Sequence, residues 1–288
     1  MIKILFYIIS CIPKSLFVCF IDFYIYCKAY KLFKSYKITK VNLKIAYPDL
    51  SNNNIELTAK LSIRESIISG YESINAWASI SSANDKSIFK INNHFLLKNH
   101  VNENNSLMLV AVHNRSVDML LRWINTQTRT TSLYKKIKNK YLNSFVKKSR
   151  EIKGSVCVET NITGVRKLYK AIKQNKVVCF AADQVPQRGM GEYIKFYNRD
   201  AYSTTLVQTI ALKTLIPILF IYMNSNKDNF LSISINECSK DIYNDSKHSH
   251  IVNSFIEQII NKRPIDYSWE YKRFKKNKPN QNDPYLFI

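Results

Sequence analysis

SLMLVAVHNRSVDMLL, residues 106–121, contains a short apolar run, Leu107–Val112, that stops abruptly at His113. A continuous apolar run of this length between polar residues indicates a strand that is buried on both faces. The residues that follow, Ser116 to Ile124, have the pattern of a helix with Ser116 as its N-cap. His113 is therefore predicted at the carboxyl end of a strand, where open α/β sheets bind their ligands.

Asp118 follows His113 by five positions and lies one turn into the predicted helix, close enough to fold back onto the imidazole. A carboxylate that holds one ring nitrogen leaves the other nitrogen free to take a proton from a hydroxyl. A histidine at a strand end can also be a simple surface residue, and the helix dipole alone favours an acid in the first turn. The spacing by itself leaves both interpretations open.

The rest of the chain alternates apolar runs with helical segments. Strands are expected at 89–97, 130–134, 155–158, 176–182, 193–197, 216–223 and 230–235, and helices at 51–80, 138–150, 163–173, 203–213, 250–261 and 265–274. Residues 99–105 are expected to form a turn, and the tail from Lys275 is expected to be poorly ordered. This alternation predicts an α/β fold, a mostly parallel mixed sheet flanked by helices.

Three polar side chains each end one of the predicted parallel strands: His113, Tyr134 and Asp183. The carboxyl ends of parallel strands meet at one edge of a sheet, so these residues are expected to line one cleft.

The chain is strongly basic, with 43 Lys and Arg against 21 Asp and Glu and a net charge of +22 over 288 residues. Such an excess needs a negative partner, which can be nucleic acid, an anionic membrane surface or an acidic substrate. The sequence contains no zinc finger, basic-aromatic strand signature or helix-turn-helix, which argues against nucleic acid. None of the six cysteines forms C-x-x-C or a zinc spacing, so we expect no metal site and a reducing compartment.

Residues 1–33 contain two apolar runs on either side of Pro13-Lys14, and no small-residue cleavage site follows them. Basic residues come next, at Lys28, Lys31, Lys34, Lys37 and Lys40. A bilayer span needs about 20 apolar residues, so a single span, a helix in the membrane interface and a buried helix all remain open. We expect a membrane-anchoring segment at 1–40 and one catalytic domain at 41–288.

The segment His113-Asn114-Arg115-Ser116-Val117-Asp118 resembles the H-x4-D/E motif of the glycerolipid acyltransferase superfamily. Further segments narrow the resemblance to the late acyltransferases of lipid A biosynthesis, the lauroyl/myristoyl transferase family. These segments are KVNLKIAYPDL at 40–50, the series Tyr134, Asn139 and Arg150, Gly164-Val165-Arg166, Ala182-Asp183-Gln184 with the block through Thr204, and YSWEYKRFK at 267–275. The chain departs from the family pattern at Lys135 and Lys136, which replace Arg-Pro, and at Tyr271 and Lys272, which replace His-Arg.

The resemblance implies transfer of a fatty acyl chain from acyl carrier protein to a hydroxyl of a lipid A precursor, of the Kdo-lipid IVA type, without a cofactor. This reaction belongs to lipopolysaccharide biosynthesis at the cytoplasmic face of the bacterial inner membrane, so an anionic membrane surface is an expected partner and nucleic acid is not. We expect His113 to be the general base, Asp118 to orient it, and Arg150 to stabilise an oxyanion or bind a phosphate.

Seven further residues in the matching segments are expected to bind substrate: Asn114, Arg115, Ser116, Tyr134, Arg166, Asp183 and Gln184. The simpler alternatives are a cation at a helix end for Arg150, turn formation for Asp183 and Gln184, and helix capping for the hydroxyls of Ser203 and Thr204. An acyltransferase acting on another glycolipid or a lysophospholipid remains an alternative, as does a catalytically silent basic membrane-associated protein.

Overall fold

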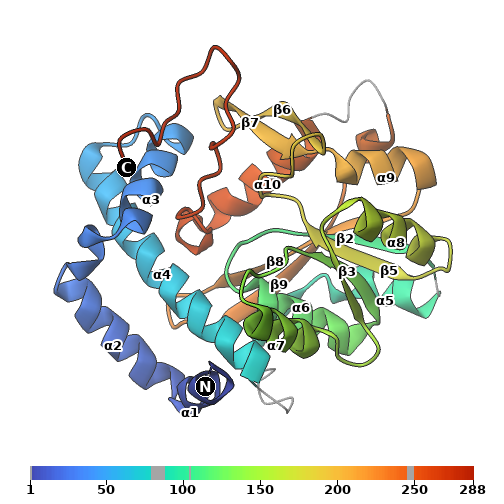
Figure 1. The fold of residues 1–288 in the computed structure, drawn as a ribbon, viewed down its shortest axis with the longest axis horizontal. Coiled ribbons are helices and arrows are strands. Elements are labelled where there is room, and N and C mark those ends of the chain that lie inside the picture. Colours follow the sequence, from blue (N-terminus) through green and yellow to red (C-terminus); the bar gives the residue numbers. More distant parts are fainter. Residues whose placement is uncertain (1, 79–87, 104, 245–249) are drawn as a thin grey trace.

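A seven-stranded sheet forms the centre of the computed structural model, which describes residues 2–78, 88–103, 105–244 and 250–288 (Figure 1). Its strands follow the order β1-β9-β8-β2-β5-β3-β4. They are β1 (Ile88–Asn92), β2 (Leu107–Ala111), β3 (Thr130–Tyr134), β4 (Val156–Glu159), β5 (Val177–Ala181), β8 (Ile218–Ser225) and β9 (Leu231–Glu237). β9 runs antiparallel to β8, and the other paired neighbours run parallel. The predicted α/β class, a mostly parallel mixed sheet flanked by helices, is confirmed.

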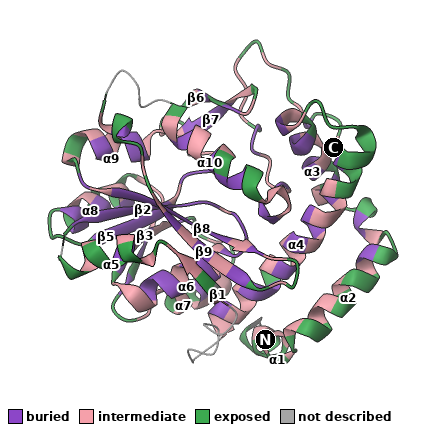
Figure 2. Cartoon of the chain, turned by 180° about the vertical axis from the view of Figure 1, so that it is seen from behind, coloured by how far each residue is buried: buried purple, intermediate pink, exposed green. Residues whose placement is uncertain are grey.

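Helices cover both faces of this sheet (Figures 1 and 2). One face packs against α5 (His94–Asn102), α6 (Val117–Gln127) and α7 (Lys140–Arg150), and the other against α8 (Ile162–Ile172), α9 (Leu206–Thr214) and α10 (Ile251–Lys262). All five residues of β2 are buried, and Leu109 and Val110 face opposite layers of the core. The continuous apolar run of this strand therefore results from burial on both faces.

A long helix, α4 (Asn52–Ala78), crosses the end of the domain and contacts the N-terminal helices. These are α1 (Ile2–Cys11), α2 (Lys14–Tyr26), the 3₁₀ turn η1 (Ala29–Leu32) and α3 (Lys34–Ala46). Within the described residues, no helix taken alone is long and apolar enough for a bilayer span. The pair α1 and α2 meets that condition together, with a bend of 98° between them. The expected anchor at 1–40 and the boundary with 41–288 stay predictions.

Several local predictions were wrong. Residues 94–102 form helix α5 instead of the end of a strand and a turn. A hairpin of β6 (Gly191–Phe196) and β7 (Arg199–Thr204) occupies the start of the helix expected at 203–213, and the expected helix at 265–274 contains only the 3₁₀ turn η5 (Pro264–Asp266). Another 3₁₀ turn, η3 (Lys240–Tyr243), precedes α10. The final residues of the helix expected at 51–80, and residue 104 of the expected turn, lie outside the described residues.

The tail was expected to be poorly ordered, yet it packs back onto the domain. Tyr285 is only 3% exposed, and its hydroxyl donates to the side-chain oxygen of Asn42, 2.5 Å away. The same asparagine donates to the carbonyl oxygens of Trp269 and Tyr271. The C-terminal segment is therefore held by hydrogen bonds from α3, which no local sequence pattern reveals.

The turn between β2 and α6 is fixed by a buried cluster of charges around Arg115. This residue has a left-handed backbone, with φ of 60°, and its side chain is buried. Its guanidinium donates to both oxygens of Glu72, at 2.9 and 3.0 Å, and it also contacts Glu65 and Asp266. Other cations contact the same carboxylates from the rim of the cluster, namely Lys14 at Glu72, Arg64 at Glu65 and Arg263 at Asp266.

Replacing Arg115 by alanine should destabilise the protein, because three buried carboxylates lose their central cation while only their rim partners remain. Removing one partner of a buried ionic cluster typically costs about 3 kcal/mol or more. Urea unfolding of Arg115→Ala, followed by circular dichroism, measures this loss. Arg166→Ala is the matched control, because Arg166 is exposed on α8, and it should change the free energy of unfolding by no more than about 0.5 kcal/mol. Equal stability of the two variants would contradict the structural role of the cluster.

Candidate active site

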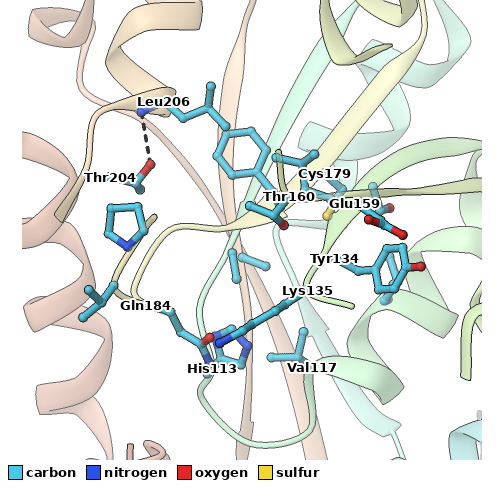
Figure 3. Close-up of a pocket in the computed structure, with 18 of the residues that line it drawn as sticks. His113, Val117, Tyr134, Lys135, Glu159, Thr160, Cys179, Gln184, Thr204 and Leu206 are labelled. Atoms are coloured by element: carbon cyan, nitrogen blue, oxygen red, sulfur yellow. Dashed lines mark hydrogen bonds between the residues drawn. The ribbon is translucent and has the colours of Figure 1, made fainter. Parts of the chain in front are cut away.

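A cavity of about 650 Å³ opens at the carboxyl ends of β2, β3, β4 and β5. Parallel pairing of these strands brings the residues after each of them to one edge of the sheet. Of the three residues expected to line one cleft, His113 and Tyr134 line the cavity, whereas Asp183 is buried and does not line it. Figure 3 shows His113, Lys135 and Gln184 at one end of this cavity, with Tyr134, Glu159 and Cys179 on another part of its wall. The volume is in the range of small-molecule sites, which is about 300–1,000 Å³.

His113 is held by a carboxylate from the neighbouring strand end. Its Nδ1 lies 2.8 Å from an Oδ1 of Asp183, which follows β5, and its side chain is 29% exposed while that of Asp183 is 2% exposed. β5 pairs with β2 in register, so the two strand ends lie side by side. The contact fixes Nδ1 toward the protein and leaves Nε2 for the cavity. An imidazole whose Nδ1 is oriented by an acid can use its Nε2 as a general base.

The charge of Asp183 decides the protonation of the imidazole. Burial lowers the pKa of His113, but the Asp183 carboxylate and its hydrogen bond outweigh burial, so the pKa lies above its ordinary value. Burial raises the pKa of Asp183, but His113 and backbone hydrogen bonds outweigh burial, so the pKa lies below its ordinary value and this acid stays ionised. Burial and the neighbouring Asp183 hold the pKa of Tyr267 well above its ordinary range, which keeps its phenol protonated beside that carboxylate.

Asp118 was expected to contact the imidazole of His113, but it does not. It accepts a bidentate pair of hydrogen bonds from Arg150, at 2.7 Å from Nε and 3.1 Å from one Nη. The expectation that Asp118 orients His113 is wrong, because the last turn of α7 places a guanidinium over the first turn of α6 and takes up both carboxylate oxygens. Both Asp118 and Arg150 line the cavity, so the structure brings them together with His113.

Three of the residues expected to bind substrate lie underneath the cavity and do not line it. Asn114 donates to the carbonyl oxygen of Met223 at 2.9 Å and to the side chain of Asn224. Arg115 forms the charge cluster described above, and Ser116 caps α6 by accepting from the backbone N–H of Met119. Their exposures of 0%, 2% and 1% show that they build the turn which presents His113.

The other expected residues divide between the cavity and the surface. Tyr134 and Gln184 line the cavity. Arg166 does not, because it lies exposed on the outer side of α8. In the segment Gly164-Val165-Arg166, the structure requires the glycine, because an added Cβ at Gly164 would lie 1.9 Å from the carbonyl oxygen of Glu159. The glycine permits close packing of α8 against the end of β4.

The sequence did not reveal how many lysines surround the cavity. Lys135 and Lys136 follow β3, while Lys275 and Lys276 reach the same cavity from the C-terminal segment. The first pair stands where the sequence departs from its family pattern. The second pair lies in a segment that was expected to be disordered, although its similarity to the C-terminal signature was a signal that it contributes to the site.

A cysteine also lines the cavity, but its environment suppresses nucleophilic chemistry. Burial raises the pKa of Cys179 to about 12, so it stays a thiol. Reactive cysteines have lowered pKa values in electropositive, partly exposed surroundings. In the part of the chain that the structure describes, no group of three His, Cys, Asp or Glu side chains is arranged to hold a metal ion. His113, whose Nδ1 is held by Asp183, is a group at this site that can take up and release a proton.

A family model described as bacterial lipid A biosynthesis acyltransferase matches residues 1–276 of the chain. The match covers the turn that carries His113, the strand that precedes Asp183, and the C-terminal segment through Lys276. No curated protein matches the chain.

The pKa of His113 should depend mainly on Asp183. In Asp183→Asn the carboxylate is lost while burial remains, so the pKa should fall from above to below its ordinary value of about 6.5. Titration of the imidazole Hε1 resonance by NMR measures this change, with His113→Gln identifying the signal among the five histidines. Asp118→Asn is the comparison variant and should lower the pKa less, since Asp118 makes the weaker contribution. An unchanged pKa in Asp183→Asn would show that the contact does not control the base.

Proposed function

This chain belongs to the bacterial lipid A biosynthesis acyltransferase family, and we propose that it transfers a fatty acyl chain from acyl carrier protein to a hydroxyl of a lipid A precursor. The acceptor is of the Kdo-lipid IVA type, and the donor is the thioester of the carrier. The observation that carries this proposal is the contact of Asp183 with His113, whose side chain lines the cavity. It supplies one base, held in one orientation, where a hydroxyl and a thioester can meet.

The reaction needs one proton transfer in each direction. His113 Nε2 takes the proton of the acceptor hydroxyl while its oxygen attacks the thioester carbonyl. The resulting tetrahedral intermediate collapses, the carbon–sulfur bond breaks, and the proton on His113 passes to the departing thiolate. Asp183 stabilises the imidazolium that exists between the two steps. The sum is an ester and a free carrier thiol, without an acyl-enzyme.

Negative charge develops on the carbonyl oxygen during this attack and needs a cation nearby. Arg150 supplies it from the cavity wall, where its bidentate contact with Asp118 fixes the plane of the guanidinium. The pair is partly exposed, with side-chain exposures of 19% and 11%, so it can meet a bound substrate. In this mechanism Asp118 orients Arg150 and Asp183 orients His113.

The composition of the cavity suits both substrates. Its inner wall includes apolar side chains from β2 and α6, such as Ala111, Leu120 and Ile124, which can contact an acyl chain. The lysines at 135, 136, 275 and 276 give the same cavity a positive rim. A lipid A precursor carries phosphates and acidic sugars, and acyl carrier protein is acidic, so this rim favours both partners.

The acceptor resides in the inner leaflet of the bacterial inner membrane, so the protein works at the cytoplasmic face of that membrane. Enzymes of this family are membrane-associated. The exposed apolar side chains of the first two helices support this location.

Loss of the base should nearly abolish acyl transfer. We expect His113→Ala to lower the rate by about 10²–10⁴-fold, the usual contribution of a general base. The assay follows radiolabelled acyl chains from acyl carrier protein to a tetra-acylated Kdo-lipid A precursor. His94→Ala is the control, because His94 contacts Gln127 and does not line the cavity. Label that moves only to another glycolipid or to lysophosphatidate would replace the proposed acceptor, and full transfer by a folded His113→Ala would overturn the mechanism.

Neutralising the lysines that follow β3 should weaken acceptor binding more than catalysis. In Lys135→Gln/Lys136→Gln we expect the KM for the phosphorylated acceptor to rise several-fold while kcat changes little, because these cations act on bound and activated substrate alike. The rise should shrink at high salt, which screens exposed charges. The control is Lys167→Gln/Lys170→Gln on the exposed side of α8. A fall in kcat at unchanged KM would instead place these lysines at the reacting carbonyl.

A further inference from the structure

We propose that α1 and α2 lie flat in the surface of an anionic bilayer, bent at their junction, and do not cross it. The partner of this face is the headgroup and upper acyl region of one leaflet. This inference concerns the first two helices and is independent of the acyl transfer proposed above.

The outward side of both helices is apolar. Ile4, Leu5, Tyr7 and Ile8 of α1 are 53–65% exposed, and Leu16, Phe20, Phe23 and Tyr26 of α2 are 48–81% exposed. We call these residues the outer face. An exposed apolar patch of this kind on a protein surface marks a site that binds a membrane or another protein. Figure 2 shows exposed residues along α2, in contrast to the buried strands of the sheet.

The inward side of the same helices is attached to α4 by specific polar contacts. In α2, Lys14 donates to Glu72 at 2.7 Å, and Asp22 accepts two hydrogen bonds from Arg64, at 2.5 and 3.1 Å. Between α1 and α2, the carbonyl oxygen of Ile12 accepts from the hydroxyl of Tyr71. These contacts bind α2 along its length and also fix the junction.

Aromatic contacts attach the same two helices to the domain. Phe17 of α2 stacks on Tyr71 with ring centroids 4.3 Å apart. Phe6 of α1 packs against Trp77 of α4 and Phe145 of α7, with centroids 5.7 and 5.9 Å away. Both helices therefore rest on the folded domain on one side, and the 98° bend between them follows its surface.

A span through the bilayer would require this arrangement to be dismantled. The two helices would have to straighten into one, which separates Lys14 and Asp22 from their partners on α4. Those two charges would then enter the hydrocarbon region, where charged side chains are costly. In the flat arrangement Lys14 stays paired with Glu72, and Asp22, whose side chain is 52% exposed, stays paired with Arg64 at the lipid–water boundary, while the outer face is buried in lipid, as in interfacial amphipathic helices.

The charges beside the outer face fit an anionic surface. Exposed lysines follow α2 directly, at Lys28, Lys31, Lys34 and Lys37, and Lys3 lies exposed on α1. Basic residues next to a membrane-binding segment strengthen its binding to an anionic leaflet. Asp22 is the acid within α1 and α2, and Arg64 pairs with it. The complementarity favours a membrane over a second copy of this basic chain.

The flat arrangement also determines where the cavity lies. Phe6 contacts Phe145 of α7, and Lys3 Nζ lies 5.8 Å from the centroid of the same ring. α7 ends at Arg150, which lines the cavity. The outer face therefore begins next to the helix that carries a wall of the site.

Three native cysteines allow a direct test, because Cys11, Cys19 and Cys27 are exposed and spaced eight residues apart. In Cys238→Ser, variants that keep one of the three are labelled with a fluorophore, since Cys157 and Cys179 are buried. The labelled protein is bound to vesicles of phosphatidylethanolamine and phosphatidylglycerol that contain lipids brominated at different depths. We expect all three labels to report one shallow depth. In a span the labelled positions would lie about 12 Å apart along the helix axis, with Cys11 and Cys19 near the middle of the bilayer and Cys27 near one surface, and that result would overturn the inference.

A second measurement tests the outer face itself. Sedimentation with the same vesicles should show Phe20→Glu/Phe23→Glu losing most of its binding, and wild type binding vesicles of phosphatidylcholine more weakly. The control is Phe95→Glu, because Phe95 is 59% exposed on α5, on the other side of the domain (Figure 1). Unchanged vesicle binding by Phe20→Glu/Phe23→Glu would overturn the inference. Loss of self-association in that variant, without loss of vesicle binding, would assign the face to a second copy and also overturn it.

Discussion

The contact on which the structure depends most is the burial of Arg115 among three carboxylates. The turn from β2 into α6 is short, and Arg115 adopts a left-handed backbone within it. Such a conformation persists in a non-glycine residue when the surroundings fix it. Here Glu65 and Glu72 of α4 hold its guanidinium, while its backbone N–H donates to the carbonyl oxygen of Asp266 at 2.7 Å. The residue before the turn, His113, is thereby aimed at the cavity.

The strands and their polar ends could be predicted from sequence, because each depends on a local pattern. Continuous apolar runs identified β2 and β5, and parallel pairing made their carboxyl ends converge near His113 and Asp183. The partner of His113 could not be predicted in this way. It depends on β5 lying next to β2, a property of the whole sheet, whereas Asp118 is closer in sequence and is engaged by Arg150.

The conformation of the C-terminal segment could not be predicted from its local sequence pattern. Its apolar spacing favours a helix at 265–274, but long-range hydrogen bonds decide its conformation. Asn42 donates to the carbonyl oxygens of Trp269 and Tyr271, and the Tyr271 hydroxyl accepts from the backbone N–H of Val185 at 3.0 Å. A helix would use those carbonyls internally. The irregular path brings Lys275 and Lys276 to the cavity and supports the loop after Asp183.

The turn that carries His113 and the N-terminal helices share one carboxylate. Glu72 accepts from Arg115 on one side and from Lys14 of α2 on the other, at 2.9 and 2.7 Å. Removing Lys14 from this contact would leave Glu72 to Arg115 alone, and shifting Arg115 would disturb the turn that holds His113. Because buried charge clusters tolerate little displacement without losing their mutual compensation, the orientation of α2 and that of the imidazole are tied together. This coupling suits a protein that takes a lipid substrate from a membrane surface. The helices that face the membrane and the imidazole that faces the acceptor hydroxyl then keep a fixed relative orientation.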